Sequence, residues 1–316
     1  MNYYLGIDGG GTKTHAVIID ENFNIVYDKK FESTHIITAG DEKFINIMST
    51  IYNEALQITN SNLKYMFCAL AGYGEFKNDN EKIENILTSI YQIPYKVLND
   101  SVGVWAGGLL CENGIGLIAG TGSCCCGISN NEYTRVGGWG YIAGDEASAY
   151  WIATKSVNAY MKIVDGRLET SIIKNEIDKA FNLDEENNIL NLIYRKMDCK
   201  RPEIAQIAKS CSIAAEKGCK IANEILDQAA YELFDHISTT ALKMNTDYTI
   251  PVTYTGGVFN SKVFKSYLIS YMEKSKIDLK LVEPITNAGH GSAIYAYVLA
   301  GNDLTKEKRK LIKNKI

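Results

Sequence analysis

Residues Leu98 to Ser123, LNDSVGVWAGGLLCENGIGLIAGTGS, decide the fold prediction for this chain. Tyr95 to Leu98 is predicted to be a short buried strand, and Asp100 follows it directly. A helix comes next, and then a strand over 115–119 ends in the turn Gly120-Thr121-Gly122-Ser123. A carboxylate after a strand stands where α/β proteins bind ligands, and a turn of small residues lets backbone N–H groups approach an anion. The combination indicates phosphoryl transfer, with an N-cap aspartate and an ordinary hairpin turn as the alternative.

Length and composition set the class of protein. The 316 residues are enough for two domains, and 46% hydrophobic with 22% charged residues is a globular composition. The net charge is −4 and no long basic block is present, so we expect no nucleic-acid partner. No apolar run approaches the length of a membrane helix or a signal peptide. We therefore expect a cytoplasmic protein with no membrane partner.

The eight cysteines do not form a recognisable metal motif. Cys124, Cys125 and Cys126 are consecutive, so on a strand their side chains alternate between faces and cannot all bind one metal. No CxxC spacing is present, and the four histidines are scattered. We interpret the cysteines as reduced packing residues.

The N-terminal strand leads into a second glycine-rich turn. Residues 3–8 are predicted to be a strand, Gly9-Gly10-Gly11-Thr12-Lys13-Thr14 a tight turn, and 16–20 and 24–31 two further strands. The spacing is not that of a Walker A loop, but three glycines leave amides free to face phosphate. Asp8 would repel phosphate unless a cation lay between them, which predicts a Mg²⁺ site bound to Asp8 through water. The alternative is a plain glycine hairpin.

The order of the predicted elements repeats. The first 112 residues are predicted as βββαβαβα, and at Gly114 the three-stranded meander begins again, which suggests a duplication with a ligand cleft between the halves. Strand 251–255 then ends in Gly256-Gly257, where an adenosine could lie against the backbone. The remaining predicted elements are helices over 168–181, 185–197, 204–215, 219–244, 261–273 and 288–300, the last sizeable one, and a strand over 278–283.

A glycine-rich segment follows the second meander. In Gly137-Gly138-Trp139-Gly140, a large flat side chain on a permissive backbone suits a lid or a sugar contact. Asp145 and Glu146 come shortly afterwards, where the alternative is that they only favour the N-terminus of the next helix.

These stretches together resemble the N-acetylglucosamine kinase/BadF-BadG-BcrA-BcrD ATPase family, in the superfamily of actin, hexokinase and the heat-shock chaperone ATPases. The matching segments are DGGGTKT from Asp8, the Asp100 segment, IAGTGS from Ile118, GGWGYIAGDEASAYWI from Gly137 and TGGVF from Thr255. The resemblance runs along nearly the whole chain in order. The segment from Gly137 is the most specific part and indicates the amino-sugar kinase branch.

The resemblance implies an α/β fold of two RNase H-like (actin-like ATPase) domains that flank a cleft, over residues 1–112 and 113–316. The second domain would carry a helical insertion over about 165–246, and the last helix could pack back on the first domain. It further implies ATP, Mg²⁺, an amino-sugar substrate phosphorylated at O6, and a homodimer. Asp100 would be the general base. The implied ATP contacts are Gly9, Gly10, Gly11, Thr12, Lys13, Gly120, Thr121, Gly122, Ser123, Gly256 and Gly257, and the implied sugar contacts are Asp100, Gly138, Trp139 and Asp145.

One position departs from the family pattern. An asparagine that contacts sugar hydroxyls after the third strand is replaced here by Thr34-His35. A histidine can donate a hydrogen bond and, when protonated, can pair with a carboxylate. We therefore add His35 to the predicted sugar contacts and predict that N-acetylmuramic acid, which carries an O3-lactyl group, is accepted beside N-acetylglucosamine. The alternative is that His35 is a surface loop residue and the pocket is closed at O3.

Two other functions share the implied fold. An ATPase activator of a radical dehydratase would hold an iron–sulfur cluster, for which the triple cysteine is the only support. A sugar-responsive regulator without catalysis would need a DNA-binding module, of which we find no sign in the sequence.

Overall fold

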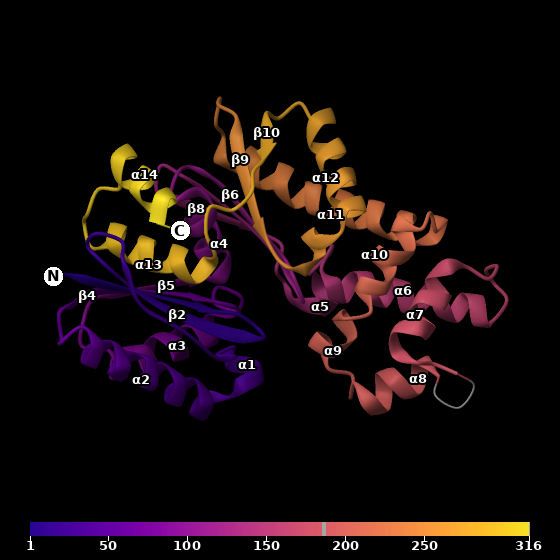
Figure 1. Cartoon of the computed structure of the whole chain (residues 1–316), viewed down its shortest axis with the longest axis horizontal. Helices are drawn as coiled ribbons and strands as arrows, with labels where there is room; N and C mark the ends of the chain where they lie inside the picture. Colours follow the sequence, from indigo (N-terminus) through magenta and orange to yellow (C-terminus); the bar gives the residue numbers. More distant parts are fainter. Residues whose placement is uncertain (185–187, 316) are drawn as a thin grey trace. The chain divides into compact units, whose positions relative to one another are not determined.

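The structure is a computed structural model that describes residues 1–184 and 188–315. The chain divides into two compact units. Unit 1 comprises residues 1–117, 126–133 and 282–316, and unit 2 comprises residues 118–125 and 134–281. Figure 1 shows the chain from its N-terminal strands (indigo) to its C-terminal helices (yellow).

The first sheet is a mixed sheet of five strands. Its order is β3-β2-β1-β4-β5, with β2 antiparallel to β1 and β3, and with β4 and β5 following β1 in parallel. The strands are β1 (Tyr3–Gly9), β2 (Lys13–Asp20), β3 (Ile25–Glu32), β4 (Leu63–Leu70) and β5 (Tyr95–Asn99). This confirms the predicted meander followed by parallel strands, and it brings the C-terminal ends of β1, β4 and β5 to one edge.

Helices cover both faces of this sheet (Figure 1). One core joins the strands to α2 (Asp41–Ile58) and α3 (Lys77–Ile90), and the other joins them to α4 (Asp100–Leu109) and α13 (Ala288–Leu299). A short helix, α1 (Ile36–Ala39), precedes α2. Successive residues of β1 alternate between the two cores: Leu5 and Ile7 lie in the first, and Tyr4 in the second.

Gly6 lets α13 approach β1 closely. A Cβ atom at Gly6 would lie 2.0 Å from the backbone nitrogen of Ala293 and 2.4 Å from the carbonyl carbon of Ser292. Because these are backbone atoms of a packed helix, no side-chain rotation can relieve the overlap.

We expect Gly6→Ala to lower the free energy of unfolding by about 2–3 kcal/mol, the upper part of the range for overpacked cores. Gly11→Ala is the matched control, because nothing lies within 4 Å of a Cβ atom there. Urea unfolding of both variants measures the difference. Equal stability of the two variants would show that α13 does not press on β1 as described.

The second sheet repeats the order of the first. Read from its other edge, it runs β8-β7-β6-β9-β10. When the strands of each sheet are numbered along the chain, both sheets therefore have the order third-second-first-fourth-fifth. Its strands are β6 (Gly114–Ala119), β7 (Ser123–Ser129), β8 (Glu132–Val136), β9 (Ile250–Thr255) and β10 (Leu279–Leu281). The repeat follows the two meanders that the sequence predicts.

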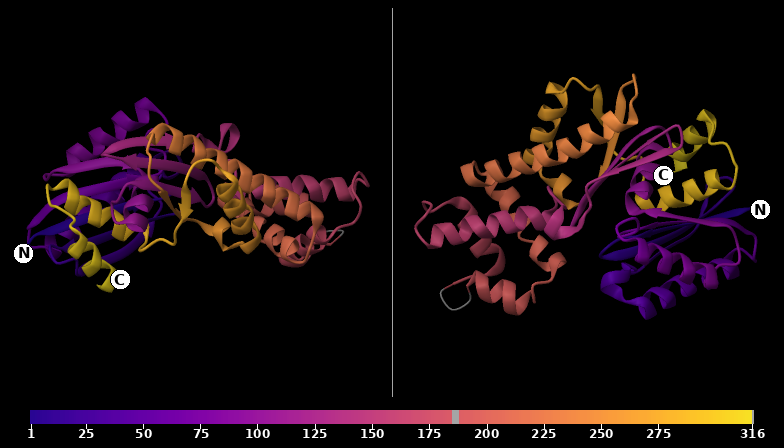
Figure 2. Two further views of the ribbon diagram at one scale, coloured as in Figure 1. Left: turned by 90° about the horizontal axis from the view of Figure 1, so that it is seen from above. Right: turned by 180° about the vertical axis from the view of Figure 1, so that it is seen from behind.

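Unit 2 is otherwise helical, and α11 lies beside α10 and α12 (Figure 2). Its helices are α5 (Gly140–Ala143), α6 (Ala149–Val164), α7 (Ile172–Phe181), α8 (Ile189–Asn191), the π-helix η1 (Leu192–Lys196), α9 (Arg201–Ala205), α10 (Ala208–Glu216), α11 (Lys220–Met244), the 3₁₀ helix η2 (Gly257–Asn260) and α12 (Lys262–Lys274). No helix in the described part of the chain is both long and apolar enough to cross a membrane.

Three predicted helices differ from the structure, and one helix of the structure was not predicted. The helix predicted over 168–181 begins only at Ile172. Residues 185–187 of the helix predicted over 185–197 lie outside the described residues, and the rest is α8 followed by the π-helix. The helix predicted over 204–215 is two helices, α9 and α10, and α9 begins early because Pro202 fits a first helical turn. A further helix, α14 (Lys306–Lys315), was not predicted, because Ile312 is its one buried residue and leaves almost no apolar periodicity.

Candidate functional site

The predicted site residues fall into two sets, one in each unit. Unit 1 holds Asp8, Gly9, Gly10, Gly11, Thr12, Lys13, His35 and Asp100. Unit 2 holds Gly120, Thr121, Gly122, Ser123, Gly138, Trp139, Asp145, Gly256 and Gly257.

In unit 1, two carboxylates lie at the C-terminal edge of the first sheet. Asp8 stands near the end of β1, and Asp100 is the first residue of α4, directly after β5. The N-cap of α4 is Asn99, whose side-chain oxygen accepts a hydrogen bond from the backbone nitrogen of Ser101 at 3.1 Å. Capping is therefore done by Asn99, and the alternative role of Asp100 as the N-cap does not apply.

The two carboxylates influence each other's charge. Burial and the nearby charge of Asp100 raise the pKa of Asp8 to about 7, while Lys13 opposes the shift. Hard oxygen ligands and excess negative charge favour Mg²⁺. The side chains present thus fit a divalent cation at this edge.

The glycine hairpin between β1 and β2 is tied to the chain that follows β3. The Gly10 amide donates to the Lys13 carbonyl at 3.0 Å, and the Ser33 hydroxyl donates to the Gly10 carbonyl at 2.9 Å. The hydroxyls of Thr14 and Thr34 lie 2.9 Å apart. The tip stays open, because nothing lies within 4 Å of a Cβ atom built at Gly11. An anion could therefore approach the backbone at the tip.

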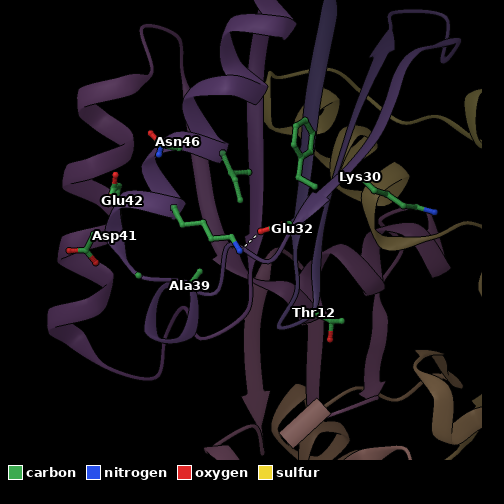
Figure 3. Close-up of a pocket in the computed structure, with 11 residues that line it drawn as sticks. Thr12, Lys30, Glu32, Ala39, Asp41, Glu42 and Asn46 are labelled. Atoms are coloured by element: carbon green, nitrogen blue, oxygen red, sulfur yellow. Dashed lines mark ion pairs between the residues drawn. The ribbon is translucent and has the colours of Figure 1, made fainter. Parts of the chain in front are cut away.

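A surface groove of about 1070 Å³ lies beside this hairpin (Figure 3). Of the described residues that line it, Thr12 alone belongs to the predicted site, and the others come from β3, α1, α2 and the residue between these helices. Glu32 forms an ion pair with Lys43 across it. The groove is thus an outer surface of unit 1 and does not contain the two carboxylates.

His35 is partly buried next to the same sheet edge. It is the N-cap residue of α1, and its Nδ1 lies 3.2 Å from the Thr38 hydroxyl. Its Nε2 would lie 3.1 Å from a Cβ atom at Gly72, in the turn after β4. His35 therefore lies in the loop after β3, against the turn that follows β4.

In unit 2, the second glycine turn is held between β6 and α6. The Gly120 amide donates to the Gly122 carbonyl at 2.9 Å, and the Gly120 carbonyl accepts from the Ala149 amide at 2.7 Å. At Gly256, φ is +113° and a Cβ atom would lie 2.2 Å from the Ala119 carbonyl oxygen, so only glycine fits. Gly257 faces open space. Small residues thus leave the backbone bare at the ends of β6 and β9.

Asp145 is buried, and its carboxylate already has protein partners. Its exposed fraction is 6%, and Oδ2 accepts from the Arg201 guanidinium at 2.5 Å. The backbone N–H groups of Ser123 and Gly140 also donate to it. Burial raises the pKa of Asp145, and these partners oppose the increase. Asp145 consequently joins the glycine turn, α5 and α9.

Arg201 was missed by the sequence reasoning. Besides the ion pair, its guanidinium lies 4.8 Å from the ring centre of Tyr141 and 5.8 Å from that of Tyr150. Such cation–π contacts hold a planar guanidinium in place. Arg201 is far from Asp145 in the sequence, and nothing in its local sequence indicates the pair.

Trp139 is exposed to solvent over 57% of its surface, between glycines. The Arg135 guanidinium lies 4.9 Å from its ring centre and also donates to the carbonyl groups of Gly137 and Gly138. Gly138 has a φ of +71°, and a Cβ atom there would lie 3.0 Å from the sulfur of Cys124. Arg135 therefore fixes a strained turn that presents a flat apolar ring to solvent. It was also missed, although it lies just before the glycines.

The three consecutive cysteines are buried and have separate surroundings. Cys125 Sγ lies 3.1 Å from the Thr240 hydroxyl, and Cys126 Sγ lies 3.2 Å from the Ser101 carbonyl oxygen. In the described part of the chain they belong to no cluster of three metal-ligating side chains. This agrees with packing residues and gives no support to an iron–sulfur cluster.

A family model, described as the BadF/BadG/BcrA/BcrD ATPase family, matches residues 5–300. The chain belongs to this family. Membership in the BadF/BadG/BcrA/BcrD ATPases implies the use of ATP, which accords with the two glycine turns.

Characterised relatives and solved structures extend the comparison. The chain is 28% identical to an N-acetylmuramic acid/N-acetylglucosamine kinase of Clostridium acetobutylicum, over 94% of this chain and 98% of that one. It is 26% identical to an N-acetyl-D-glucosamine kinase of Dictyostelium discoideum, over 84% and 88%. The structure of a candidate N-acetylglucosamine kinase from Chromobacterium violaceum matches with a TM-score of 0.73 at 18% identity, over 93% and 98%. This last match shows that the BadF/BadG/BcrA/BcrD ATPase described here has the sugar-kinase fold.

Proposed function

We propose that the protein is an ATP-dependent kinase that phosphorylates an N-acetylated amino sugar at O6. The observation that carries the proposal is the position of Asp100, beside Asp8 and the glycine hairpin at one sheet edge. The names of the two kinases from Clostridium and Dictyostelium that are similar in sequence support the sugar class.

In the proposed reaction Asp100 is the general base. It accepts the proton of the sugar O6 hydroxyl as that oxygen bonds to the γ-phosphorus, and the bond from the γ-phosphorus to the β,γ-bridging oxygen breaks to release ADP. The helix start fixed by Asn99 holds this carboxylate in place. After phosphoryl transfer, the proton on Asp100 passes to water.

The glycine turns would bind the phosphates of ATP. In the turns Gly9–Lys13 and Gly120–Ser123, backbone N–H groups other than those of Gly10, Gly120 and Ser123, which donate within the protein, can face phosphate oxygens. Gly256 and Gly257 would border the adenosine. Mg²⁺, held through water by Asp8, would neutralise phosphate charge when bound. In unit 2, Gly138, Trp139 and Asp145 would contact the sugar, with the ring of Trp139 against its apolar face.

An ADP-release assay against a panel of sugars tests the proposal. We expect sugar-dependent ADP formation with N-acetylglucosamine, and a ³¹P NMR spectrum of the product that places the phosphate on O6. Glucose and glucosamine are the matched sugars that lack the acetyl group. ADP release that is independent of every sugar would contradict kinase activity. A homodimer in the cytoplasm is also predicted, and light scattering during size-exclusion chromatography measures the oligomer.

We propose that the imidazole of His35, in the loop after β3, contacts the carboxylate of an acceptor sugar that carries one. We expect N-acetylmuramic acid to be phosphorylated as well, and His35→Ala to lower kcat/KM for this sugar by about 10–100-fold, the value of a hydrogen bond to a charged group. N-acetylglucosamine should be affected much less. His35→Gln, which keeps a donor without a positive charge, is the control for charge pairing. If His35→Ala phosphorylates N-acetylmuramic acid as well as the wild type does, His35 does not recognise the lactyl group. If the wild type does not phosphorylate N-acetylmuramic acid at all, the predicted acceptance of this sugar is wrong.

A further inference from the structure

A cluster of two histidines and one aspartate lies in unit 1, and one of its members, His15, pairs with Asp8 across β1 and β2. One ligand atom from each of His15, Asp28 and His290 lies within 4.8 Å of the others. The Nε2 atoms of His15 and His290 lie 2.8 and 2.9 Å from the two carboxylate oxygens of Asp28. The three residues come from β2, β3 and α13, so the fold gathers them from three elements.

The surroundings of the cluster place both imidazole rings. A Cβ atom at Gly289 would lie 2.3 Å from Nδ1 of His15, so glycine at this position leaves the room that the ring occupies. Nδ1 of His290 lies 2.9 Å from the Thr286 hydroxyl. When this nitrogen carries the proton and donates to Thr286, Nε2 of His290 has a free lone pair on the side of Asp28. Such an outer hydrogen bond commonly orients a metal-ligating histidine.

We propose that His15, Asp28 and His290 bind a divalent transition-metal ion, with Zn²⁺ the favoured ion. Two imidazole nitrogens and one carboxylate oxygen are typical zinc ligands, at about 2.0–2.2 Å from the metal. Ligand atoms at that distance in a tetrahedral site lie about 3.3 Å apart. The two nitrogen–oxygen pairs would each lengthen by about half an ångström, and the two histidine nitrogens would settle at the same separation from a distance of at most 4.8 Å.

The exposure of the cluster suits a site with one open position. His15 is buried, whereas the side chain of Asp28 is 42% exposed and can leave room for a water ligand. The bound ion would link the edge strand β3 to α13.

Cobalt(II) titration of the whole protein tests the site, because tetrahedral Co²⁺ has intense visible absorption and octahedral Co²⁺ does not. We expect one equivalent of tetrahedral Co²⁺, displaced by Zn²⁺, and a rise in Tm with Zn²⁺. His290→Ala and Asp28→Asn should each weaken binding by more than about tenfold. His35→Ala removes an imidazole elsewhere in unit 1 and should leave binding unchanged.

Asp100→Asn separates this site from the proposed Mg²⁺ site. We expect the tetrahedral signal to persist in that variant, whatever happens to kinase activity. Circular dichroism establishes that each variant is folded. Asp28→Asn is the most informative variant, because asparagine has nearly the same shape as aspartate and removes only the charge. An absence of tetrahedral Co²⁺, or binding that is equal in wild type and Asp28→Asn, overturns the proposal and leaves the cluster as a hydrogen-bonded link between β2, β3 and α13.

Discussion

Asp100→Asn is expected to lower kcat by about 10²–10⁴-fold, the contribution typical of a positioned general base. The amide keeps the size of the side chain, and the Asn99 cap keeps the start of α4, so nucleotide and sugar binding should change little. Steady-state kinetics at saturating ATP, sugar and Mg²⁺, with calorimetry for binding, measure the two effects separately. A loss in kcat of less than about tenfold would falsify the assignment of Asp100 as the base.

Asp8→Asn is the matched control, because it changes the neighbouring carboxylate in the same way. Its main effect should be on the Mg²⁺ concentration needed for half-maximal rate. The pKa of about 7 at Asp8 means that lowering the pH below 7 should weaken Mg²⁺ binding in the wild type. In Asp100→Asn the charge that helps to raise this pKa is gone, so the pH at which Mg²⁺ binding weakens should fall.

Arg201→Met is expected to lower the free energy of unfolding by about 3–5 kcal/mol, the cost of leaving one partner of a buried ion pair alone. Asp145 is 6% exposed, and methionine retains much of the arginine stem but no charge. Because the side chain of Arg201 is itself 32% exposed, water can replace part of the lost contact, and we expect the lower end of the range. Urea unfolding at pH 8 measures the loss.

A double variant and the pH dependence distinguish this cause from lost packing. Asp145→Asn together with Arg201→Met should recover much of the stability, since no buried charge remains. In Arg201→Met alone, burial should raise the pKa of Asp145 further, because the opposing guanidinium is gone. The deficit should then shrink as the pH falls through that pKa and the carboxyl is neutralised. A deficit that is the same at pH 5 and pH 8, and in the double variant, would point to packing instead.

The sequence predicts the first two strands of each meander well because their apolar residues lie close together and the turn between them is rich in glycine. It fails where helices are short or polar. The break between α9 and α10 and the helix α14 depend on tertiary packing, which periodicity alone does not reveal. The backbone strain at Asp145, with a φ of +56°, is likewise set by its three partners and not by its neighbours in sequence.

For the site, the sequence identifies residues that stand at the ends of strands, such as Asp8 and Asp100. Their order in a parallel sheet is fixed once the strands are recognised. The sequence does not identify the partner of a buried carboxylate when that partner comes from a distant helix. Arg201 and His290 are examples: each meets a residue that is 56 or 262 positions away along the chain. The scattered histidines lack any metal-ligand spacing for the same reason.

The contact of α13 with β1 at Gly6 constrains the way this protein is made on the ribosome. The strand is synthesised before unit 2, but the helix that covers one of its faces begins at Ala288. All of unit 2 beyond residue 134 is synthesised in between, which at about 5–20 residues per second takes on the order of ten seconds or more. During that interval the apolar face around Tyr4 and Phe67 lacks its cover from α13. The nascent chain is therefore expected to be a client of chaperones, and truncation before Ala288 should yield an aggregation-prone fragment and not a folded first domain.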